Sequence, residues 1–224
     1  MTIMSGSNSR DWMMARLKET HHVASIQPIG NDFMLIHRKD GFQNKKMRPV
    51  TAAVISTKQV TDETLKPLLE TEQEFEFVTN LPKQGIWTGA AIDLADFHNL
   101  GWGGMGDLMS AMAQDSVEGF QRKEYSFVMR GLAQHSKVES IDRIYDRLIN
   151  VNRYGLPPLT TVLLNEYELT AEHIRNARDI YGKFKAILRT NPNGGPTKNA
   201  LSVAHELGAD IFQWGEFLGR LNKE

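Results

Sequence analysis

The chain has 224 residues, of which 41% are apolar, and its formal net charge is -1 at pH 7. This length allows one ordinary domain or two small ones, each with a hydrophobic core. The absence of cysteine excludes disulfides, thiolate metal clusters and cysteine nucleophiles. Because the chain has no run of eighteen apolar residues and no secretory signal at its start, we expect a cytoplasmic protein with no membrane contact.

The first half predicts an alternation of helices and strands. Trp12, Met13 and Leu17 have the spacing of a short amphipathic helix. The stretches VASIQPIG and DFMLIHR are typical of a hairpin, and the continuously apolar VTAAVIST is typical of a central strand. There follow a helix that starts at TDETL, a strand FEFVTN, a helix with Ala91 and Ala95 on one face, a short strand near LGWG and a last helix. The predicted order is α-β-β-β-α-β-α-β-α, an α/β sandwich around a small mixed sheet.

The second half repeats this pattern. Trp12 aligns with Phe127 and Ile26 with Ile141, both 115 positions apart. Further pairs follow in order: Asp32 with Asp146, Thr61 with Thr170, Thr79 and Asn80 with Thr190 and Asn191, and Ala91 and Ala95 with Ala200 and Ala204. Ordered matches in successive blocks indicate an internal duplication. We predict two tandem copies, residues 10–112 and 124–224, joined by a polar linker at 113–123 and related by a pseudo-twofold axis.

The order of elements, the strand ending in Thr-Asn and the T-x-x-A-x-x-x-A helix after it resemble the restriction-endonuclease-like fold, PD-(D/E)xK, especially its Mrr-type branch. The resemblance covers nearly all of both halves. It implies a metal-dependent nuclease site, with an Asp at the hairpin and an acid or Gln, a spacer and a Lys on the next strand. It also implies a setting in DNA processing or in antiviral defence against phages.

The chain departs from that motif in both halves. In the first, Asp32 stands at the hairpin, but Ser56 takes the place of the acid two residues before Lys58. In the second, the corresponding triplet is Asn-Glu-Tyr at 165–167, with neither acid nor lysine in register. Because Mg2+ is held mainly by anionic oxygen, we expect a non-catalytic nuclease-like protein without a cofactor. The alternative is a Mg2+-dependent nuclease that uses Asp32 and Lys58. Turn chemistry and a solvated strand end also explain these two residues.

A basic loop in the first hairpin is absent from the second half. It carries five cations, Arg38, Lys39, Lys45, Lys46 and Arg48, and one acid, Asp40. Such a ribbon can follow a phosphate backbone, so nucleic acid is one expected partner. An equally good explanation is that the charges prevent a solvated hairpin tip from pairing with another strand. The expected partner is then a protein.

The two loops after the Thr-Asn strands, which contain Thr79, Asn80, Thr190 and Asn191, support a third hypothesis. A Gly-rich turn before a helix presents free N–H groups to an anion, as a small-ligand or nucleotide sensor requires. Neither loop is a Walker motif, and a tight strand-to-helix turn also explains both.

Overall fold

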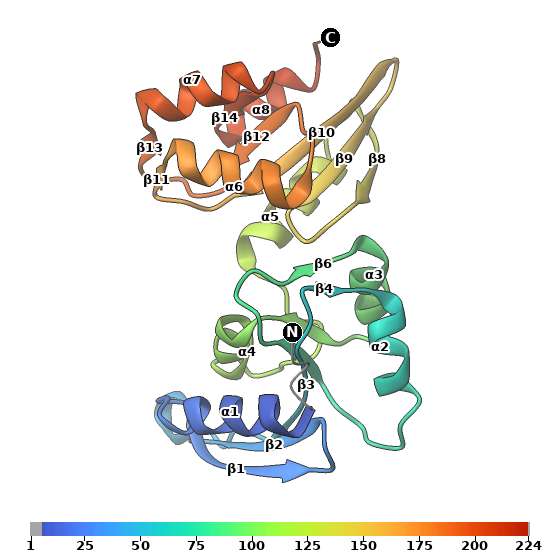
Figure 1. Cartoon of the computed structure of the whole chain (residues 1–224), viewed down its shortest axis with the longest axis vertical. Helices are drawn as coiled ribbons and strands as arrows, with labels where there is room; N and C mark the ends of the chain where they lie inside the picture. Colours follow the sequence, from blue (N-terminus) through green and yellow to red (C-terminus); the bar gives the residue numbers. More distant parts are fainter. Residues whose placement is uncertain (1–5, 224) are drawn as a thin grey trace. The chain divides into compact units, whose positions relative to one another are not determined.

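The computed structural model of the chain describes residues 6–223, without the side chains of residues 6–8 and 42. It divides into two units, Met1–Gln121 and Arg122–Glu224. Each unit contains helices and one five-stranded mixed sheet, which confirms the expected α/β class (Figure 1). No helix in the described part of the chain is both long and apolar enough to cross a bilayer.

The first unit contains one five-stranded sheet in the order β1-β2-β3-β5-β7 and a short parallel pair, β4 and β6. Strands β1, β2 and β3 pair antiparallel, while β5 and β7 extend the sheet parallel to β3. The elements are α1 (Gly6–Lys18), β1 (Val23–Ile29), β2 (Phe33–Arg38), the 3-10 turn η1 (Phe42–Asn44), β3 (Val50–Ile55), β4 (Gln59–Val60), α2 (Asp62–Leu69), β5 (Phe77–Asn80), β6 (Ile86–Trp87), α3 (Gly89–Phe97), β7 (Gly101–Gly103) and α4 (Met105–Met112).

The second unit contains a five-stranded sheet in the order β8-β9-β10-β12-β14 and a short parallel pair, β11 and β13. Its first three strands are antiparallel, and β12 and β14 follow β10 in parallel. The elements are α5 (Lys123–Ala133), β8 (Val138–Arg143), β9 (Leu148–Arg153), β10 (Leu156–Leu164), β11 (Glu168–Leu169), α6 (Ala171–Tyr181), β12 (Ala186–Arg189), β13 (Gly195–Pro196), α7 (Lys198–Glu206), β14 (Asp210–Phe212) and α8 (Trp214–Arg220).

Helices cover both faces of each sheet. Because strand side chains alternate between faces, Phe77 packs with α1 and α4 while the next residue, Val78, packs with α2 and α3. In the second unit, Ala186 packs with α5 and α8 and Ile187 with α6 and α7. Each unit is therefore a three-layer α/β/α sandwich with one core on each side of its sheet.

Helices and strands follow one another in the same order in the two units, apart from the turn η1. Each unit has one pair of two-residue strands that the sequence did not predict, β4 with β6 and β11 with β13. Two residues are too short for any periodicity to appear in the sequence. The predicted helix starts at Thr61 and Thr170 are confirmed, since both hydroxyls accept a hydrogen bond from the backbone N–H three residues later.

The strand ladders correct two of the residue pairs taken from the sequence. The parallel ladder of the first unit ends at Ile55 beside Asn80, and that of the second ends at Leu164 beside Arg189. Equivalent positions are thus 109 apart from β3 and β10 onward, so Asn80 corresponds to Arg189 rather than to Asn191. The repeated Thr-Asn dipeptide matches in letters but is two positions out of register.

The hairpin Asp is also out of register, by one position. The Val54 N–H donates to the Asp32 carbonyl at 2.7 Å, and the equivalent Leu163 N–H donates to the Arg147 carbonyl at 2.8 Å. Asp32 therefore corresponds to Arg147 and not to Asp146. The sequence match had followed residue identity, whereas the hydrogen-bonded ladder fixes which backbone positions are equivalent.

The expected linker at 113–123 is corrected as well, because most of it belongs to the first unit. Val117 is fully buried and Phe120 is 7% exposed, and both lie in the core that α1 and α4 cover. The Phe120 ring lies 6.3 Å from the Phe77 ring. The segment is polar on average because only these two side chains point inward, which is why its composition suggested a joint.

A buried arginine occupies the same place in each unit. Arg38 and Arg153 end the second strand of each sheet and are 6% and 5% exposed. The Arg38 guanidinium donates to the carbonyls of Met112, Gln114 and Asp115 at and just beyond the end of α4. The Arg153 guanidinium donates to those of Arg220, Leu221 and Lys223 at and just beyond the end of α8. Each cation thus satisfies carbonyls and opposes the negative end of the last helix.

Candidate functional site

The implied nuclease residues lie at the sheet edge where the parallel strands β3, β5 and β7 end. Asp32 directly precedes β2, half-buried in the turn that contains Gly30 with φ +53. Ser56 directly follows β3, and both Ser56 and Lys58 are exposed. The carboxyl edge of parallel strands is the usual place for a ligand in such sheets. The fold therefore brings Asp32 and Ser56 to one edge of the sheet.

Asn80 holds the loop that carries Ser56 and Lys58. Its amide Nδ2 donates to the Thr57 carbonyl at 2.9 Å, and its Oδ1 accepts from the Thr57 N–H at 3.0 Å. Gly85 lies against this contact, since a Cβ there would stand 2.3 Å from the Asn80 Nδ2. Asn80, which we expected in a ligand loop, is thus occupied in closing the sheet edge.

The same edge of the second unit has a different charge. Arg147 takes the place of Asp32, and its Nε lies 4.0 Å from the Asp146 carboxylate. The Tyr181 hydroxyl donates to Asp146 at 3.3 Å, and burial raises the pKa of Tyr181. Burial likewise raises the pKa of Tyr125, a neighbour of Arg147, to about 12. The acid at this edge is engaged by a phenol and a guanidinium, so it is not placed to hold a metal.

Arg189 takes the place of Asn80 and does not repeat its role. It is 3% exposed, and its Nε and Nη1 have no hydrogen-bond partner among the described residues. Its Nη2 donates to the Asn193 carbonyl at 3.0 Å. Arg189 therefore joins Arg147 in giving this edge a cationic character.

Mg2+ does not fit this set of side chains. The described residues contain no group of three or more His, Cys, Asp or Glu side chains that could hold a metal ion. At the first edge a neutral hydroxyl, Ser56, stands where the implied motif needs a second carboxylate. At the second edge Arg147 would repel a cation.

The cations of the basic loop are mostly paired within the first unit. Lys45 Nζ lies 2.6 Å from the Asp115 carboxylate, and Lys46 Nζ lies 2.8 Å from that of Asp40. Arg48 pairs with Glu76 at 3.3 Å and with Glu118. Hydrogen bonds from Ser116 and Arg48 lower the pKa of Glu118 to about 2.

Two cations of the basic loop, Arg38 and Lys39, lie in different surroundings. Arg38 is buried and donates to backbone carbonyls, so it is not a surface cation, and this corrects its expected role. Lys39 is exposed. The sequence missed the pairing because Asp115, Glu118 and Glu76 lie 28 residues or more from the cations that they neutralise.

In the loops expected to bind an anion, side chains of the loops themselves accept hydrogen bonds from backbone N–H groups. The helix α3 is capped by Thr88, whose hydroxyl accepts from the Ala91 N–H, and α7 is capped in the same way by Thr197. Asn191 accepts from the Asn193 N–H at 3.0 Å in a local turn. Thr79 is buried and Thr190 is partly buried, and neither hydroxyl has a hydrogen-bond partner among the described residues. These loops are built as turns.

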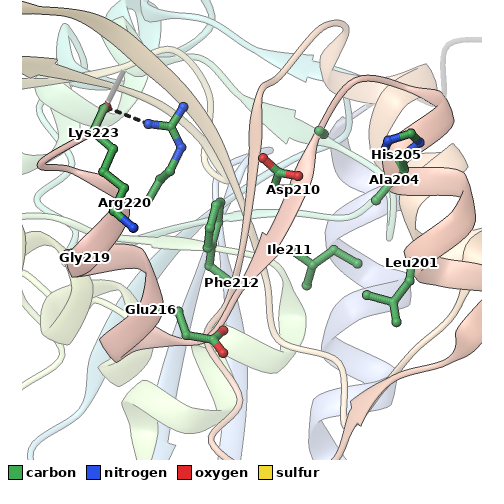
Figure 2. Close-up of a pocket in the computed structure, with 11 residues that line it drawn as sticks. Leu201, Ala204, His205, Asp210, Ile211, Phe212, Glu216, Gly219, Arg220 and Lys223 are labelled. Carbon is green, nitrogen blue, oxygen red and sulfur yellow. Dashed lines mark hydrogen bonds between the residues drawn. The ribbon is translucent and has the colours of Figure 1, made fainter.

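Sequence reasoning missed a groove beside β14, which ends the second sheet. Its volume is about 710 Å³, within the usual range for ligand sites. The floor is Ile211 and Phe212, one wall is α7 with Leu201, and the other wall is α8 with Gly219 (Figure 2). Five charged or titratable residues also line it: His205, Asp210, Glu216, Arg220 and Lys223.

Comparison of the chain with protein-family models, with curated proteins and with solved structures gives no match.

Proposed function

We propose that this chain is a duplicated protein of restriction-endonuclease-like fold that has no nuclease activity and works by binding a protein partner. The repeated element order, the shared sheet order and the matching roles of Arg38 and Arg153 support a duplication. Two copies of one domain would keep the contacts that folding requires, even where their surfaces diverge.

The proposed loss of catalysis rests on one observation. The backbone position that Asp32 holds in the first unit is held by Arg147 in the second. Two-carboxylate metal sites work by holding a divalent cation near the scissile phosphate. The first unit keeps one carboxylate and a serine, and the second places a guanidinium there. Neither edge supplies the anionic oxygens that Mg2+ needs.

The choice of a protein partner over nucleic acid rests on the basic loop. Nucleic-acid affinity comes from cations that neutralise phosphates and release counterions. Here Lys45, Lys46 and Arg48 already face carboxylates, and Arg38 is buried. A phosphate backbone would have to displace these ion pairs, which reduces what the loop can contribute.

The catalytic part is tested by incubating the chain with plasmid, linear and single-stranded DNA in Mg2+ or Mn2+. We expect no cleavage and no metal binding by calorimetry. Ser56→Glu, which restores the acid two residues before Lys58, is the positive control and should raise metal affinity. Cleavage by the parent chain that disappears in Asp32→Ala would overturn the proposal.

The partner class is tested by titrating duplex and single-stranded DNA and RNA at several salt concentrations. We expect weak binding that changes little when Lys45, Lys46 and Arg48 are replaced together by Ala. If the loop does grip phosphates, the triple variant should instead lower the salt slope by about one unit for each lost contact. That result would restore nucleic acid as the partner.

A further inference from the structure

We propose that Asn193 loses its side-chain amide in a reaction that the fold itself promotes, with the Gly194 nitrogen as nucleophile and the buried cation Arg189 as activating group. The product is an acidic residue, aspartate or isoaspartate, in the loop between β12 and β13. The inference does not depend on the proposed function, because it concerns a covalent change of the chain and not a partner.

The sequence makes position 193 the most reactive asparagine of the chain. An asparagine side chain can be attacked by the backbone nitrogen of the next residue, which closes a cyclic imide. Asn193-Gly194 is the only Asn-Gly dipeptide in the chain, and glycine lacks the Cβ that obstructs this approach. Asn191, in the same loop, is followed by Pro192, whose nitrogen carries no hydrogen and cannot act in this way.

The loop leaves both reacting groups free. Asn193 and Gly194 are exposed, so water reaches them. The Asn193 backbone is hydrogen-bonded, but its side chain makes no hydrogen bond to a described residue and can rotate toward the next nitrogen. The Gly194 N–H donates to no acceptor in the described part of the chain. The nucleophile therefore does not have to give up a hydrogen bond before it attacks.

The fold also requires glycine at position 194. Gly194 has φ +71, a conformation that other residues rarely adopt, and a Cβ there would overlap the Tyr167 carbonyl oxygen. The Gly195 N–H donates to the same carbonyl at 3.1 Å and fixes the loop against Tyr167. The residue that makes Asn193 reactive is thus imposed by the packing of the loop.

Arg189 is placed to activate the nucleophile. Its Nη2 donates to the Asn193 carbonyl oxygen at 3.0 Å, and that oxygen belongs to the same peptide group as the Gly194 nitrogen. Loss of the Gly194 proton spreads negative charge onto this oxygen, so a cation bonded to the oxygen favours the ionised form. Arg189 is 3% exposed, and a charge-assisted hydrogen bond is stronger in buried surroundings than in water.

No acid competes for the Arg189 charge. Its Nε and Nη1 have no hydrogen-bond partner, and no carboxylate among the described residues forms an ion pair with it. A guanidinium that was neutralised by an acid would stabilise a developing anion less. The positive charge of Arg189 therefore acts mainly on the Asn193 peptide group.

The first unit lacks each of these features at the equivalent positions, which are 109 residues earlier. Asn80 takes the place of Arg189 and carries no charge. Gln84 takes the place of Asn193, and its longer side chain would have to close a larger ring. Gly85 takes the place of Gly194, but its N–H already donates to the Pro82 carbonyl at 2.8 Å. We therefore expect the reaction in the second unit alone.

The reaction is balanced with water as the only co-reactant. The Gly194 nitrogen bonds to the Asn193 Cγ, the bond from Cγ to Nδ2 breaks, and Nδ2 leaves as ammonia with the proton that the Gly194 nitrogen gave up. Water then opens the cyclic imide at either of its carbonyls, and no electrons are transferred. One opening gives aspartate, and the other gives isoaspartate, in which the side-chain carbon becomes part of the main chain. Either product adds a negative charge to an edge that Arg189 makes cationic.

The experiment ages the full chain at mildly alkaline pH and follows the tryptic peptide of residues 190–198 by chromatography and mass spectrometry. We expect Asn193 to be converted before any other asparagine of the chain. Asn191 lies in the same peptide and should stay unchanged, which makes it an internal control. No conversion of Asn193, or faster conversion of another asparagine, would overturn the proposal.

Two variants test the role of the cation. Arg189→Met should slow the conversion of Asn193 about tenfold, which is less than an enclosed oxyanion donor contributes in an enzyme because the loop is exposed. Arg189→Asn, which places here the residue of the first unit, should slow it as much. Circular dichroism checks that each variant is folded, and Arg189→Asn decides the test if Arg189→Met is not.

Arg178→Met is the matched control. Arg178, in α6, is a half-buried arginine that also has an unpartnered nitrogen, and it stacks on Phe184 just before β12, whereas Arg189 ends that strand. Because it lies at the other end of the strand, its removal should change the rate less than about twofold. A loss as large as that of the Arg189 variants would overturn the specific role of Arg189.

Unfolding in urea separates the effect of the fold from that of the sequence. The parent chain and both Arg189 variants should react at the same rate there, because Arg189 no longer holds the Asn193 carbonyl. Equal rates in the folded chains, or a difference that persists in urea, would overturn the activating role of Arg189. None of these outcomes bears on the metal and cleavage tests, so failure of this inference and failure of the proposed function are distinguishable.

Discussion

The two sheets end in equivalent strands, β7 and β14, that meet different surroundings. At β7 the chain turns back, buries Val117 and Phe120 and leaves room only for glycine at position 101. At β14 the equivalent position carries an exposed Asp210, and the walls enclose a groove. The difference teaches that a few residues of covering chain can close a sheet edge, whereas the equivalent edge of the second unit is left as a groove between α7 and α8 in the described part of the chain.

A second difference lies at the carboxyl edges of the parallel strands. Asp32 and Asn80 in the first unit correspond to Arg147 and Arg189 in the second. Asn80 closes a loop with two hydrogen bonds, whereas Arg189 leaves two nitrogens without partners in the described part of the protein. Arg38 and Arg153, in contrast, share acceptors at equivalent positions, since Arg38 donates to the Met112 and Gln114 carbonyls and Arg153 to those of Leu221 and Lys223. Positions that hold helix to sheet match in the two units, and positions at the carboxyl edges differ.

The largest expected effect comes from disrupting residues 113–121, which cover the edge of β7. Phe120→Ala removes a ring that is 7% exposed and packs on Phe77, and we expect the free energy of unfolding to fall by about 3–4 kcal/mol. Urea denaturation followed by circular dichroism measures this. The exposed Gln114→Ala is the control and should stay within about 0.5 kcal/mol. A similarly small loss for Phe120→Ala would mean that residues 113–121 are a linker after all.

The next largest effect comes from removing the buried arginine that ends the second strand of each sheet. Arg38→Met and Arg153→Met each leave backbone carbonyls without donors, and we expect each to cost about 3 kcal/mol of unfolding free energy. Lys39→Met, at an exposed neighbouring position, should cost less than about 0.5 kcal/mol. If only one arginine variant loses stability, the two residues do not play equivalent roles.

A smaller effect, opposite in sign between the units, sharpens the comparison of the carboxyl edges. Asn80→Leu breaks both bonds to Thr57 and should lower the free energy of unfolding by about 2 kcal/mol. Arg189→Met removes a buried cation with two unpaired nitrogens, and we expect a change between zero and a gain of about 1 kcal/mol. Chemical denaturation measures the free energy of unfolding of both variants. An equal loss in both would contradict the difference expected between the two edges.

The smallest effect concerns pH. The pKa of Glu118 is lowered to about 2 by hydrogen bonds from Ser116 and Arg48, so its ionised form is bound more tightly in the folded chain. The stability that this adds is present above about pH 4.5, the ordinary pKa, and is lost as the pH falls toward about 2. We expect this contribution to be about 1 kcal/mol, since the pair is partly exposed. Denaturation of Glu118→Gln from pH 6 to 3 should show a shallower pH dependence than the parent, and identical profiles would rule the pairing out.

The sequence by itself determined the α/β class and the order of the main elements. Hydrophobic periodicity and local cap chemistry act over a few residues, so the helix starts at Thr61 and Thr170 could be predicted. The ordered matches between the halves predicted a repeat, and the pseudo-twofold relation between the halves stays a prediction. Asp32 and Ser56 were named together only because the chain resembles a nuclease fold, and it is the pairing of β2 with β3 that brings the two positions to one edge.

Only the tertiary structure decided which residues are equivalent and which charges are free. Matching letters paired Asp32 with Asp146 and Asn80 with Asn191, but ladder hydrogen bonds act between distant strands and shifted both pairs. The cations Lys45 and Arg48 appeared available because their acids, Asp115 and Glu118, lie far along the chain. The β14 groove arises where two helices flank the last strand. Such long-range contacts depend on how the chain packs in space, and no local pattern in the sequence records them.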